Sequence, residues 1–402
     1  MLTIVGGVYR EYCTRPRWDT FYGSAGRAAS ALACFQTEVV LHTYLDEQSF
    51  VSVDSRAALE NFQLESTSVP ELVTFYYHHG LASPRFRIPS TDYPQLTIKE
   101  EKVVRFGLIK GDAKVHSKYA VYDPQNSSKP GSFSSNGSHA EHLAVILNRY
   151  EAGLLSGQPE ATPEVQAKVL AHQEKAEVVV IKMGPMGAVV YENGSIDTVS
   201  SYQTNNVWKI GSGDAFVAYF SFYWMEKRFP ALQAADCASK ATAYYCEKRG
   251  FPKQNQLHTY NPNPIQPSQR FKEGHKPLVY LAGPFFTLAQ LWLIEQAREN
   301  LIDMGLKVFS PYHDVGLGTA DDVVQKDLDG INECDLMFAV GDGLDSGTIY
   351  EIGYACALNK PVIIYAENES EENMKMMEGS NCILCKDYVT AIYLTLWTAS
   401  QL

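Results

Sequence analysis

The chain has 402 residues, of which 45% are hydrophobic and 20% are charged, a composition typical of a folded protein with two or three full-sized domains. Its formal net charge is −12, which argues against nucleic acid or an anionic membrane surface as the main partner, because phosphate-rich partners need clustered Lys and Arg. The uninterrupted apolar runs are strand-sized and too short to span a membrane. We therefore expect a cytoplasmic protein whose partners are small molecules.

From residue 1 to about residue 258, apolar runs rich in β-branched residues alternate with helical patterns. Predicted strands cover Leu2–Val5, Val39–Thr43, Tyr119–Tyr122, Val178–Met183 and Ala188–Tyr191, and predicted helices cover Ala28–Cys34 and Ala140–Leu155. This alternation is typical of an α/β layer fold. Two segments interrupt it. The aromatic-rich run Phe75–Arg87 predicts a lid strand, on which His78 and His79 face opposite sides and so do not suit a metal, and residues 127–138 predict a mobile loop.

Gly211, Ser212, Gly213 and Asp214 follow at the start of a long helical pattern. Backbone N–H groups at such a helix start can gather around negative charge, and Asp214 can accept a proton from a hydroxyl. A helix cap or a turn explains the same four residues equally well. The wider context is what favours an anion hole with an adjacent general base.

That context consists of Asn148-Arg-Tyr-Glu151, the strand-turn-strand Val180–Val189 and the helix opening Gly23-Ser-Ala-Gly26. In this order, and with the Gly-Ser-Gly-Asp segment, they resemble the ribokinase-like (pfkB-type) sugar and nucleoside kinases over about residues 1–255. The resemblance implies a three-layer α/β domain that uses ATP and Mg²⁺. It would make Asp214 the base, Gly211, Ser212 and Gly213 the anion hole, and Asn148 and Glu151 the residues that organise Mg²⁺ and the phosphates.

The chain departs from that family where the sugar is recognised. Trp208-Lys209-Ile210 precede Gly211 in place of the usual polar residues, Glu11 replaces a sugar-binding aspartate, and Ala28 replaces an asparagine. Three uses of the domain therefore remain open: a kinase with an altered substrate, a ligand-sensing or structural pseudokinase, and an unrelated use of the fold.

Tyr260–Lys276 carries three prolines among polar residues, which predicts a semi-rigid linker. We expect a first domain over residues 1–258, a linker over 259–275 and a second domain over 276–402. In the second domain, predicted strands are Leu278–Leu281, Lys307–Phe309, Leu336–Val340 and Val362–Tyr365, and predicted helices lie at about 287–304, 320–333, 348–358 and 387–399. This pattern indicates a smaller, flavodoxin-like, doubly wound parallel sheet whose ligands bind beyond the strand C-termini.

Glu351 is the acidic residue that stands out in this second domain. It is predicted to lie in the first turn of an otherwise apolar helix, where the helix N-terminus favours an ionised carboxylate. Such a carboxylate can attack the C1′ carbon of a sugar, although a capping glutamate at an ordinary helix start would look the same.

Three further segments surround Glu351 in the predicted sheet: Tyr280–Phe286, Asp327–Ile331 and Asp345-Ser346. Together they resemble the nucleoside 2-deoxyribosyltransferase family over about residues 276–402. The resemblance implies that Glu351 attacks C1′, that Asp327 hydrogen-bonds or protonates the leaving base, that Tyr280 orients Glu351 and that Asp345 holds the 5′-hydroxyl end. Other members of the same motifs, which would line the substrate, are Gly283, Phe286 and Ser346.

This assignment fits the chemistry, because cleaving an N-glycosidic bond needs one ionised carboxylate and one proton donor. A carboxylate at position 345 would repel a 5′-phosphate, so unphosphorylated nucleosides are the expected substrates. No cofactor is expected for this domain.

The eight cysteines lie mostly inside apolar runs, and no basic and apolar leader precedes the first predicted strand, which favours a reducing compartment. Cys382 and Cys385 have CxxC spacing, but no second pair or nearby histidine supports a zinc site, so buried thiols are the simpler interpretation. No metal site is predicted.

Together the two resemblances predict a bifunctional nucleoside-metabolising enzyme, a deoxyribosyltransferase or N-glycosidase joined to a divergent sugar or nucleoside kinase. One alternative is an NAD or nucleotide N-glycosidase with an inactive, ligand-sensing kinase-like domain, and another is a pair of ligand-binding modules without activity. Both families commonly self-associate, and the apolar segment Tyr388–Leu402 suits a subunit contact or a core helix, so we expect a homo-oligomer.

Overall fold

The computed structural model of the protein describes residues 1–125 and 130–402. The chain divides into two compact units, Met1–Thr204 with Trp208–Pro264, and Asn205–Val207 with Ile265–Leu402. The division after Pro264 falls inside the segment predicted as a linker, and the linker itself stays a prediction. Of the predicted mobile loop, residues 127–129 lie outside the described part, and the remainder includes a short 3-10 helix, Phe133–Asn136.

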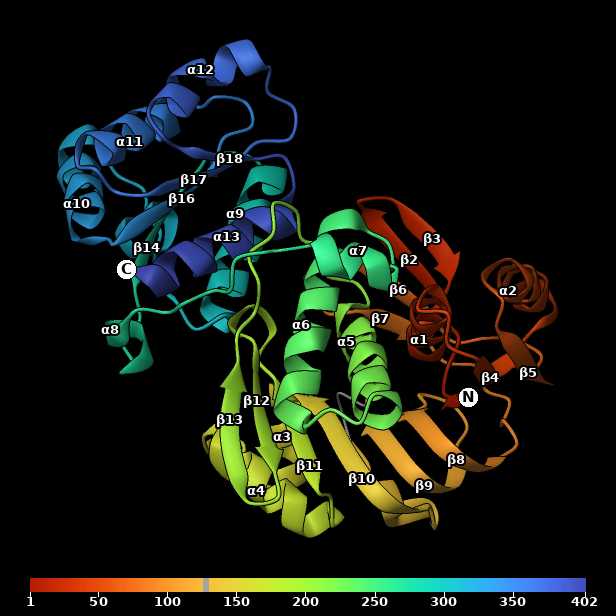
Figure 1. Ribbon diagram of the computed structural model, residues 1–402. Coiled ribbons are helices and arrows are strands. Elements are labelled where there is room, and N and C mark those ends of the chain that lie inside the picture. The colour runs from red at the N-terminus through yellow and green to blue at the C-terminus, as the bar shows by residue number, and fades with distance from the viewer. Residues whose placement is uncertain (126–129) are drawn as a thin grey trace. The chain divides into compact units, whose positions relative to one another are not determined.

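The first unit is built on one large sheet (Figure 1). Its elements are β1 (Leu2–Val5), β2 (Arg10–Arg15), β3 (Trp18–Phe21), α1 (Gly23–Cys34), β4 (Val39–Leu45), α2 (Glu47–Glu60), β5 (Gln63–Ser68), β6 (Thr74–His79), β7 (Arg85–Arg87), β8 (Leu96–Phe106), β9 (Ala113–Asp123), β10 (His139–Asn148), α3 (Arg149–Ser156), α4 (Pro163–Glu174), β11 (Val178–Lys182), β12 (Ala188–Glu192), β13 (Ser195–Val199), α5 (Ser212–Ser221), α6 (Ala231–Lys248) and α7 (Gln254–Thr259). Within the described residues the large sheet has the order β13-β12-β11-β10-β9-β8-β1-β4-β5. Its strands are parallel, except that β12 runs antiparallel to β11 and β13.

Both faces of this sheet are buried by helices. Along β11, Val178 and Val180 belong to the core shared with α1, α5 and α6, whereas Val179 and Ile181 belong to the core shared with α3 and α4. This division follows from the two-residue period of a strand, and it explains why such strands read as continuous apolar runs. The three-layer α/β architecture expected from the sequence is confirmed.

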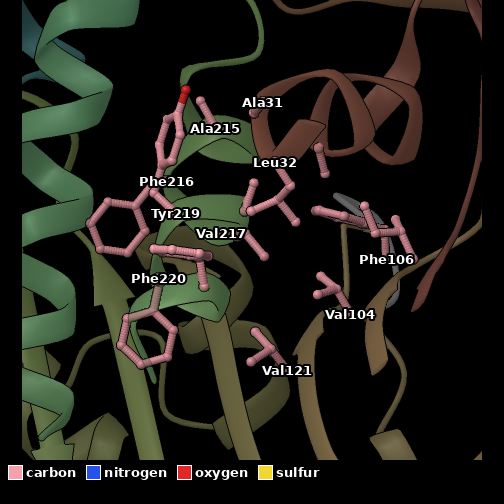
Figure 2. Close-up of a cluster of buried hydrophobic side chains, with 14 of the residues drawn as sticks. Ala31, Leu32, Val104, Phe106, Val121, Ala215, Phe216, Val217, Tyr219 and Phe220 are labelled. Carbon is pink, nitrogen blue, oxygen red and sulfur yellow. The ribbon is translucent and has the colours of Figure 1, made fainter. Parts of the chain in front are cut away.

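Figure 2 shows one of these cores, where two helices meet the middle of the sheet. Leu32 of α1 and Val217 and Phe220 of α5 meet Val104 of β8 and Val121 of β9, and all five side chains are fully buried. This packing fixes the start of α5, which carries the Gly-Ser-Gly-Asp segment, over the sheet.

The predicted helix Ala140–Leu155 is wrong in its first half. Residues His139–Asn148 form the strand β10, which lies between β11 and β9, and the helix α3 begins only at Arg149. The run Leu143–Leu147 is buried along its whole length, with β-branched Val145 and Ile146 facing opposite cores. A helix would expose part of such a run, and a strand between two layers does not.

The predicted lid segment forms strands of a separate small sheet. Within the described residues this sheet has the order β3-β2-β6-β7, with β6 and β7 contributed by the segment Phe75–Arg87 and its neighbours. Its role as a lid stays a prediction.

The second unit is a parallel sheet covered by helices (Figure 1). Its elements are α8 (Gln269–Lys272), β14 (Leu278–Ala282), α9 (Leu288–Asp303), β15 (Lys307–Phe309), α10 (Ala320–Glu333), β16 (Leu336–Val340), α11 (Ser346–Ala357), β17 (Val362–Tyr365), α12 (Glu371–Gly379), β18 (Ile383–Cys385) and α13 (Tyr388–Gln401). In the part of the chain that the structure describes, the order is β15-β14-β16-β17-β18 and all neighbours are parallel. Numbered along the chain this is 2-1-3-4-5, the flavodoxin-like order expected from the sequence.

Helix α13 contains the apolar segment that could have served as a subunit contact. It packs against α9, β17 and β18, and Trp397 is 3% exposed, which supports the core-helix interpretation. None of the helices in the described residues is both long and apolar enough to cross a membrane.

Candidate functional site

In the second unit, the candidate site lies at the point where the sheet reverses its winding order, between β14 and β16. The connections that follow these two strands leave in opposite directions, and ligands of such open sheets bind beyond the C-terminal ends of the strands at this point. Gly283 lies at this edge, where a Cβ would stand 2.7 Å from Ile294 Cδ1 and 3.0 Å from Val340 Cβ. A side chain at position 283 would therefore push the turn out of place.

Tyr280 and Glu351 form the central contact of this site. The hydroxyl of Tyr280, on β14, donates a hydrogen bond to Glu351 Oε1 on α11 over 2.7 Å. Tyr280 is fully buried, and its ring stacks on Phe309 of β15 with 5.4 Å between centroids. The other oxygen, Glu351 Oε2, has no hydrogen-bond partner in the described part of the chain. One oxygen is thus held while the other is available to a ligand.

The charge state of Glu351 is set by opposing influences. Burial raises its pKa to about 7, the hydrogen bond from Tyr280 lowers it, and the charges of Asp327 and Asp345 raise it. Burial and the charge of Glu351 also hold the pKa of Tyr280 far above its ordinary value, so the tyrosine stays a hydrogen-bond donor. These effects require that Asp327 and Asp345 lie close to Glu351, so the segments singled out in the sequence do converge.

Asp327 lies on α10, and burial raises the pKa of its carboxyl. Its Oδ1 is buried and makes no hydrogen bond within the described residues. A buried polar atom without a partner is costly, and a ligand that supplies the missing hydrogen bond relieves that cost. Asp327 therefore presents an oxygen suited to a polar group of a substrate.

Asp345 is the N-cap of α11. Its Oδ2 accepts hydrogen bonds from the backbone N–H of Thr348 at 2.9 Å and from the Thr348 hydroxyl at 3.0 Å, and Leu344 before it has a left-handed φ of 47°. The helix consequently begins at Ser346, two residues earlier than predicted. Glu351 lies in the second helical turn, so its expected place in the first turn is wrong.

The remaining predicted residues of this site are more exposed. Ser346 is the exposed first residue of α11, and Phe286 is 72% exposed on the loop after β14. The structure therefore brings together Tyr280, Glu351, Asp327 and Asp345, and leaves Phe286 at the surface of the unit.

The sequence did not point to Gly330 and Phe309, which lie beside Tyr280 and Asp327. A Cβ at Gly330 of α10 would overlap the Phe309 ring, so glycine lets α10 approach β15, whose Phe309 stacks on the Tyr280 ring. The available signal was an aromatic residue at the end of a short predicted strand, but its contact with a helix twenty residues later is not visible in a sequence.

In the first unit, the Gly-Ser-Gly-Asp segment forms the start of α5. Gly211 has a left-handed φ of 77°, and the N–H groups of Gly213 and Asp214 find no acceptor in the described residues. A Cβ at Gly213 would stand 3.6 Å from Lys182 Nζ, and that ammonium pairs with Asp123 at 2.7 Å. Free N–H groups beside a lysine suit the phosphate groups of a nucleotide such as ATP.

Asp214 itself is already hydrogen-bonded through both oxygens. Oδ2 accepts from Arg27 Nη1 at 2.8 Å, and Oδ1 accepts from Gln125 Nε2 at 2.6 Å. Arg27, which is 2% exposed, also donates from Nη2 to Glu11 Oε2 at 2.5 Å. Glu11, Arg27 and Asp214 thus form a buried carboxylate-guanidinium-carboxylate chain.

Asn148 and Glu151 cap α3 reciprocally. Asn148 Oδ1 accepts from the N–H of Glu151, and Glu151 Oε2 accepts from the N–H of Asn148, both at 2.9 Å. Burial raises the pKa of Glu151 to about 7, and the charge of Asp123 adds to this effect. Among the described residues there is no group of three or more His, Cys, Asp or Glu side chains that could hold a metal ion.

Two protein-family models match the chain. Residues 279–384 match the model of the nucleoside 2-deoxyribosyltransferase family, and residues 97–252 match that of the pfkB family carbohydrate kinases. The chain joins a pfkB-like kinase domain to a nucleoside 2-deoxyribosyltransferase-like domain. Tyr280, Asp327, Asp345 and Glu351 all lie inside the deoxyribosyltransferase match. Asp214 lies inside the pfkB match, whereas its buried partner Arg27 lies before the first matched residue.

Solved structures resemble the pfkB-like domain. A fructokinase double mutant from Vibrio cholerae O395, in a fructose-, ADP- and potassium-bound form, is 15% identical with a TM-score of 0.50 over 64% of this chain and 97% of that one. A nucleoside kinase of the ribokinase family from Methanocaldococcus jannaschii is 12% identical with a TM-score of 0.49 over 64% and 97%. The fructokinase shares the fold of this domain, which is ribokinase-like as the sequence resemblance implied. No curated protein matches the sequence.

Proposed function

We propose that the deoxyribosyltransferase-like domain breaks the N-glycosidic bond of a nucleoside, with Glu351 as the nucleophile. The family match supports a role in nucleoside metabolism. The observation that carries the finer proposal is the 2.7 Å hydrogen bond from Tyr280 to one oxygen of Glu351, which leaves the second oxygen available. A carboxylate that is held through one oxygen and has the other available is suited to attack an anomeric carbon.

The proposed reaction has two steps. In the first, Glu351 Oε2 forms a bond to C1′ while the bond from C1′ to the base nitrogen breaks, and the electron pair leaves with the base. Asp327 hydrogen-bonds or protonates the departing base. In the second, water or another base attacks C1′, the ester oxygen of Glu351 leaves with its electron pair, and Asp327 accepts a proton from the attacking group.

The environments of the two acids support these different roles. Glu351 ionises near neutral pH, and the hydrogen bond from Tyr280 favours its charged form. Burial raises the pKa of Asp327, and a nucleobase bound over it would bury the carboxyl further and raise the pKa in the same direction. The pair therefore suits one nucleophile and one proton-handling group.

Asp345 supports an unphosphorylated substrate. Its Oδ2 is used to cap α11, and Oδ1 can accept a hydrogen bond from a 5′-hydroxyl. A 5′-phosphate placed there would meet a carboxylate, which costs roughly 1–4 kcal/mol per pair of unit charges at 4 Å. We therefore propose nucleosides, and not nucleotides, as the substrate class.

The test is release of free base from a panel of ribo- and deoxyribonucleosides, followed by chromatography, with NAD included. Glu351→Gln keeps the shape of the side chain and should abolish release. Glu378→Gln on α12 is the matched control, because Glu378 is exposed and its side chain makes no hydrogen bond or ion pair within the described residues. Undiminished release by Glu351→Gln would overturn the proposal, and release of nicotinamide alone would favour the NAD alternative.

Assembly and location remain part of the proposal. We propose a cytoplasmic homo-oligomer, as expected from the two family resemblances. Light scattering after size-exclusion chromatography tests the oligomeric state, and a monomer at micromolar concentration would contradict it.

A further inference from the structure

The pfkB family match leaves open whether this chain transfers a phosphoryl group, and the buried network around Asp214 bears on that question. A carboxylate that acts as a general base must accept the proton of the hydroxyl, and it becomes neutral when it does so. Here both Asp214 oxygens accept hydrogen bonds, from Arg27 at 2.8 Å and from Gln125 at 2.6 Å. Since Arg27 is a cation buried to 98%, it occupies this position far more firmly than a neutral side chain would.

Arg27 is itself held on several sides. Its Nη1 also donates to the carbonyl of Gly23 at 3.3 Å, its guanidinium lies 5.2 Å from the centre of the Tyr22 ring, and a Cβ at Gly211 would overlap its side chain. The glycine at the start of α5, which the sequence assigned to an anion hole, therefore also makes room for this arginine.

Glu11 completes the arrangement on the other side of Arg27. Its Oε2 accepts from Arg27, and its Oε1 accepts from the backbone N–H of Gly23 at 3.1 Å. The sequence suggested that Glu11 replaces a sugar-binding aspartate. In the structure Glu11 is a second counterion of Arg27, and its contact with a sugar stays a prediction.

A sugar hydroxyl could still donate to one of the remaining lone pairs of Asp214. Accepting its proton, however, would neutralise Asp214 and leave the buried guanidinium of Arg27 with Glu11 as its one carboxylate partner in the network. Removing one partner of a buried ion pair in this way is among the most destabilising changes in proteins.

We propose that Arg27 makes Asp214 a structural counterion instead of a general base, so that the pfkB-like domain does not transfer a phosphoryl group through Asp214. The phosphate side of the site, at Gly213 and Lys182, is unaffected by this arrangement. The domain then contributes ligand binding to the protein. This inference is independent of the chemistry proposed for Glu351.

The first measurement is thermal unfolding of Asp214→Asn. If Asp214 neutralises Arg27, the substitution lowers the unfolding midpoint by roughly 5–10 °C. Asp54→Asn, at an exposed position of α2, is the matched control and leaves the midpoint unchanged. If Asp214→Asn does not fold, Glu11→Gln provides the same readout from the other carboxylate of the network. An unchanged midpoint in both network variants overturns the proposal.

The second measurement is Mg²⁺-dependent ATP consumption by the full chain with a panel of sugars and nucleosides. The expected result is no substrate-dependent consumption by the wild type. Substrate-dependent consumption that is retained in Asp214→Asn would still agree with the counterion role of Asp214. Substrate-dependent consumption that is lost in a folded Asp214→Asn protein overturns the proposal, whatever the unfolding midpoint. The base-release assay is read separately, so failure here and failure of the Glu351 chemistry are distinguishable.

Discussion

Replacing Tyr280 with phenylalanine removes the hydroxyl that donates to Glu351 Oε1, while the ring can keep its stack on Phe309. In the wild type this hydrogen bond favours the charged form of Glu351 and opposes burial, with the pKa at about 7 as the net result. Without the hydroxyl, burial is less opposed. The pKa of Glu351 should therefore rise, and less of the nucleophile should be ionised at neutral pH.

The size of this effect follows from the strength of the bond. A hydrogen bond to a charged group contributes about 1.5–3 kcal/mol, and 1.36 kcal/mol corresponds to one pKa unit, so the pKa should rise by roughly one to two units. At pH 7 the ionised fraction of Glu351 would fall from about a half to between about a tenth and a hundredth. We expect kcat/KM at pH 7 to fall roughly 5- to 50-fold, with most of the activity recovered at high pH.

The assay is the initial rate of base release as a function of pH for wild type and Tyr280→Phe. Because the nucleophile must be ionised, the rate of each protein should rise with pH through the pKa of Glu351, and this acid limb should lie one to two units higher in the variant. Tyr350→Phe serves as a control on the same helix, since Tyr350 is 63% exposed. An acid limb at the same pH in Tyr280→Phe and wild type would refute the reasoning.

Three further predictions concern stability and specificity. Glutamate in the unfolded chain has a pKa near 4.5, whereas folded Glu351 has a pKa of about 7, so the stability of the wild type falls as pH rises through this window. In urea unfolding, Glu351→Gln should therefore be more stable than the wild type by up to about 3 kcal/mol at pH 8 and equally stable at pH 4. A gain in stability at pH 4 would contradict this prediction. Asp345→Ala should lower the free energy of unfolding by about 1 kcal/mol because the α11 cap is lost. Asp345→Asn should keep the cap and raise the rate of base release from nucleoside 5′-monophosphates relative to nucleosides. An unchanged preference would show that position 345 does not contact the 5′ end. Gly330→Ala should lower the free energy of unfolding by about 1–3 kcal/mol because its Cβ overlaps the Phe309 ring, and it should slow base release by displacing Asp327. Gly353→Ala is the control, because a Cβ there meets nothing within 4 Å. In the same urea titration this control should be neutral or more stable by up to about 1 kcal/mol.

Most of the fold of the second unit could be predicted from the sequence, because its strands are short, apolar and separated by helical patterns of ordinary length. The strand β10 was missed because an apolar run such as Leu143–Leu147 does not by itself distinguish a buried strand from a buried helix. Asn148 is the N-cap of the following helix α3. A capping residue at this position indicates a helix that begins after it, and this signal outweighs the helical pattern predicted for the residues before it.

The candidate sites divide in the same way. Tyr280 and Glu351 were singled out from the deoxyribosyltransferase resemblance, and the structure shows that they are hydrogen-bonded, while their roles stay a prediction. Asp214 was equally visible, but Arg27 stands 187 positions earlier in the chain and no local pattern pairs the two. A motif shows that a carboxylate is present, and only the packed structure shows which side chain already binds it.

The central claim is that Glu351 forms a bond to the anomeric carbon of a nucleoside. A 2′-deoxy-2′-fluoroarabinonucleoside tests it, because fluorine disfavours the oxocarbenium-like transition state and should allow the glycosyl-enzyme to persist for mass spectrometry of the digested protein. We predict one fluorosugar adduct on the peptide that contains Glu351, absent in Glu351→Gln. An adduct on a different residue, or base release without any adduct and undiminished in Glu351→Gln, would contradict the account.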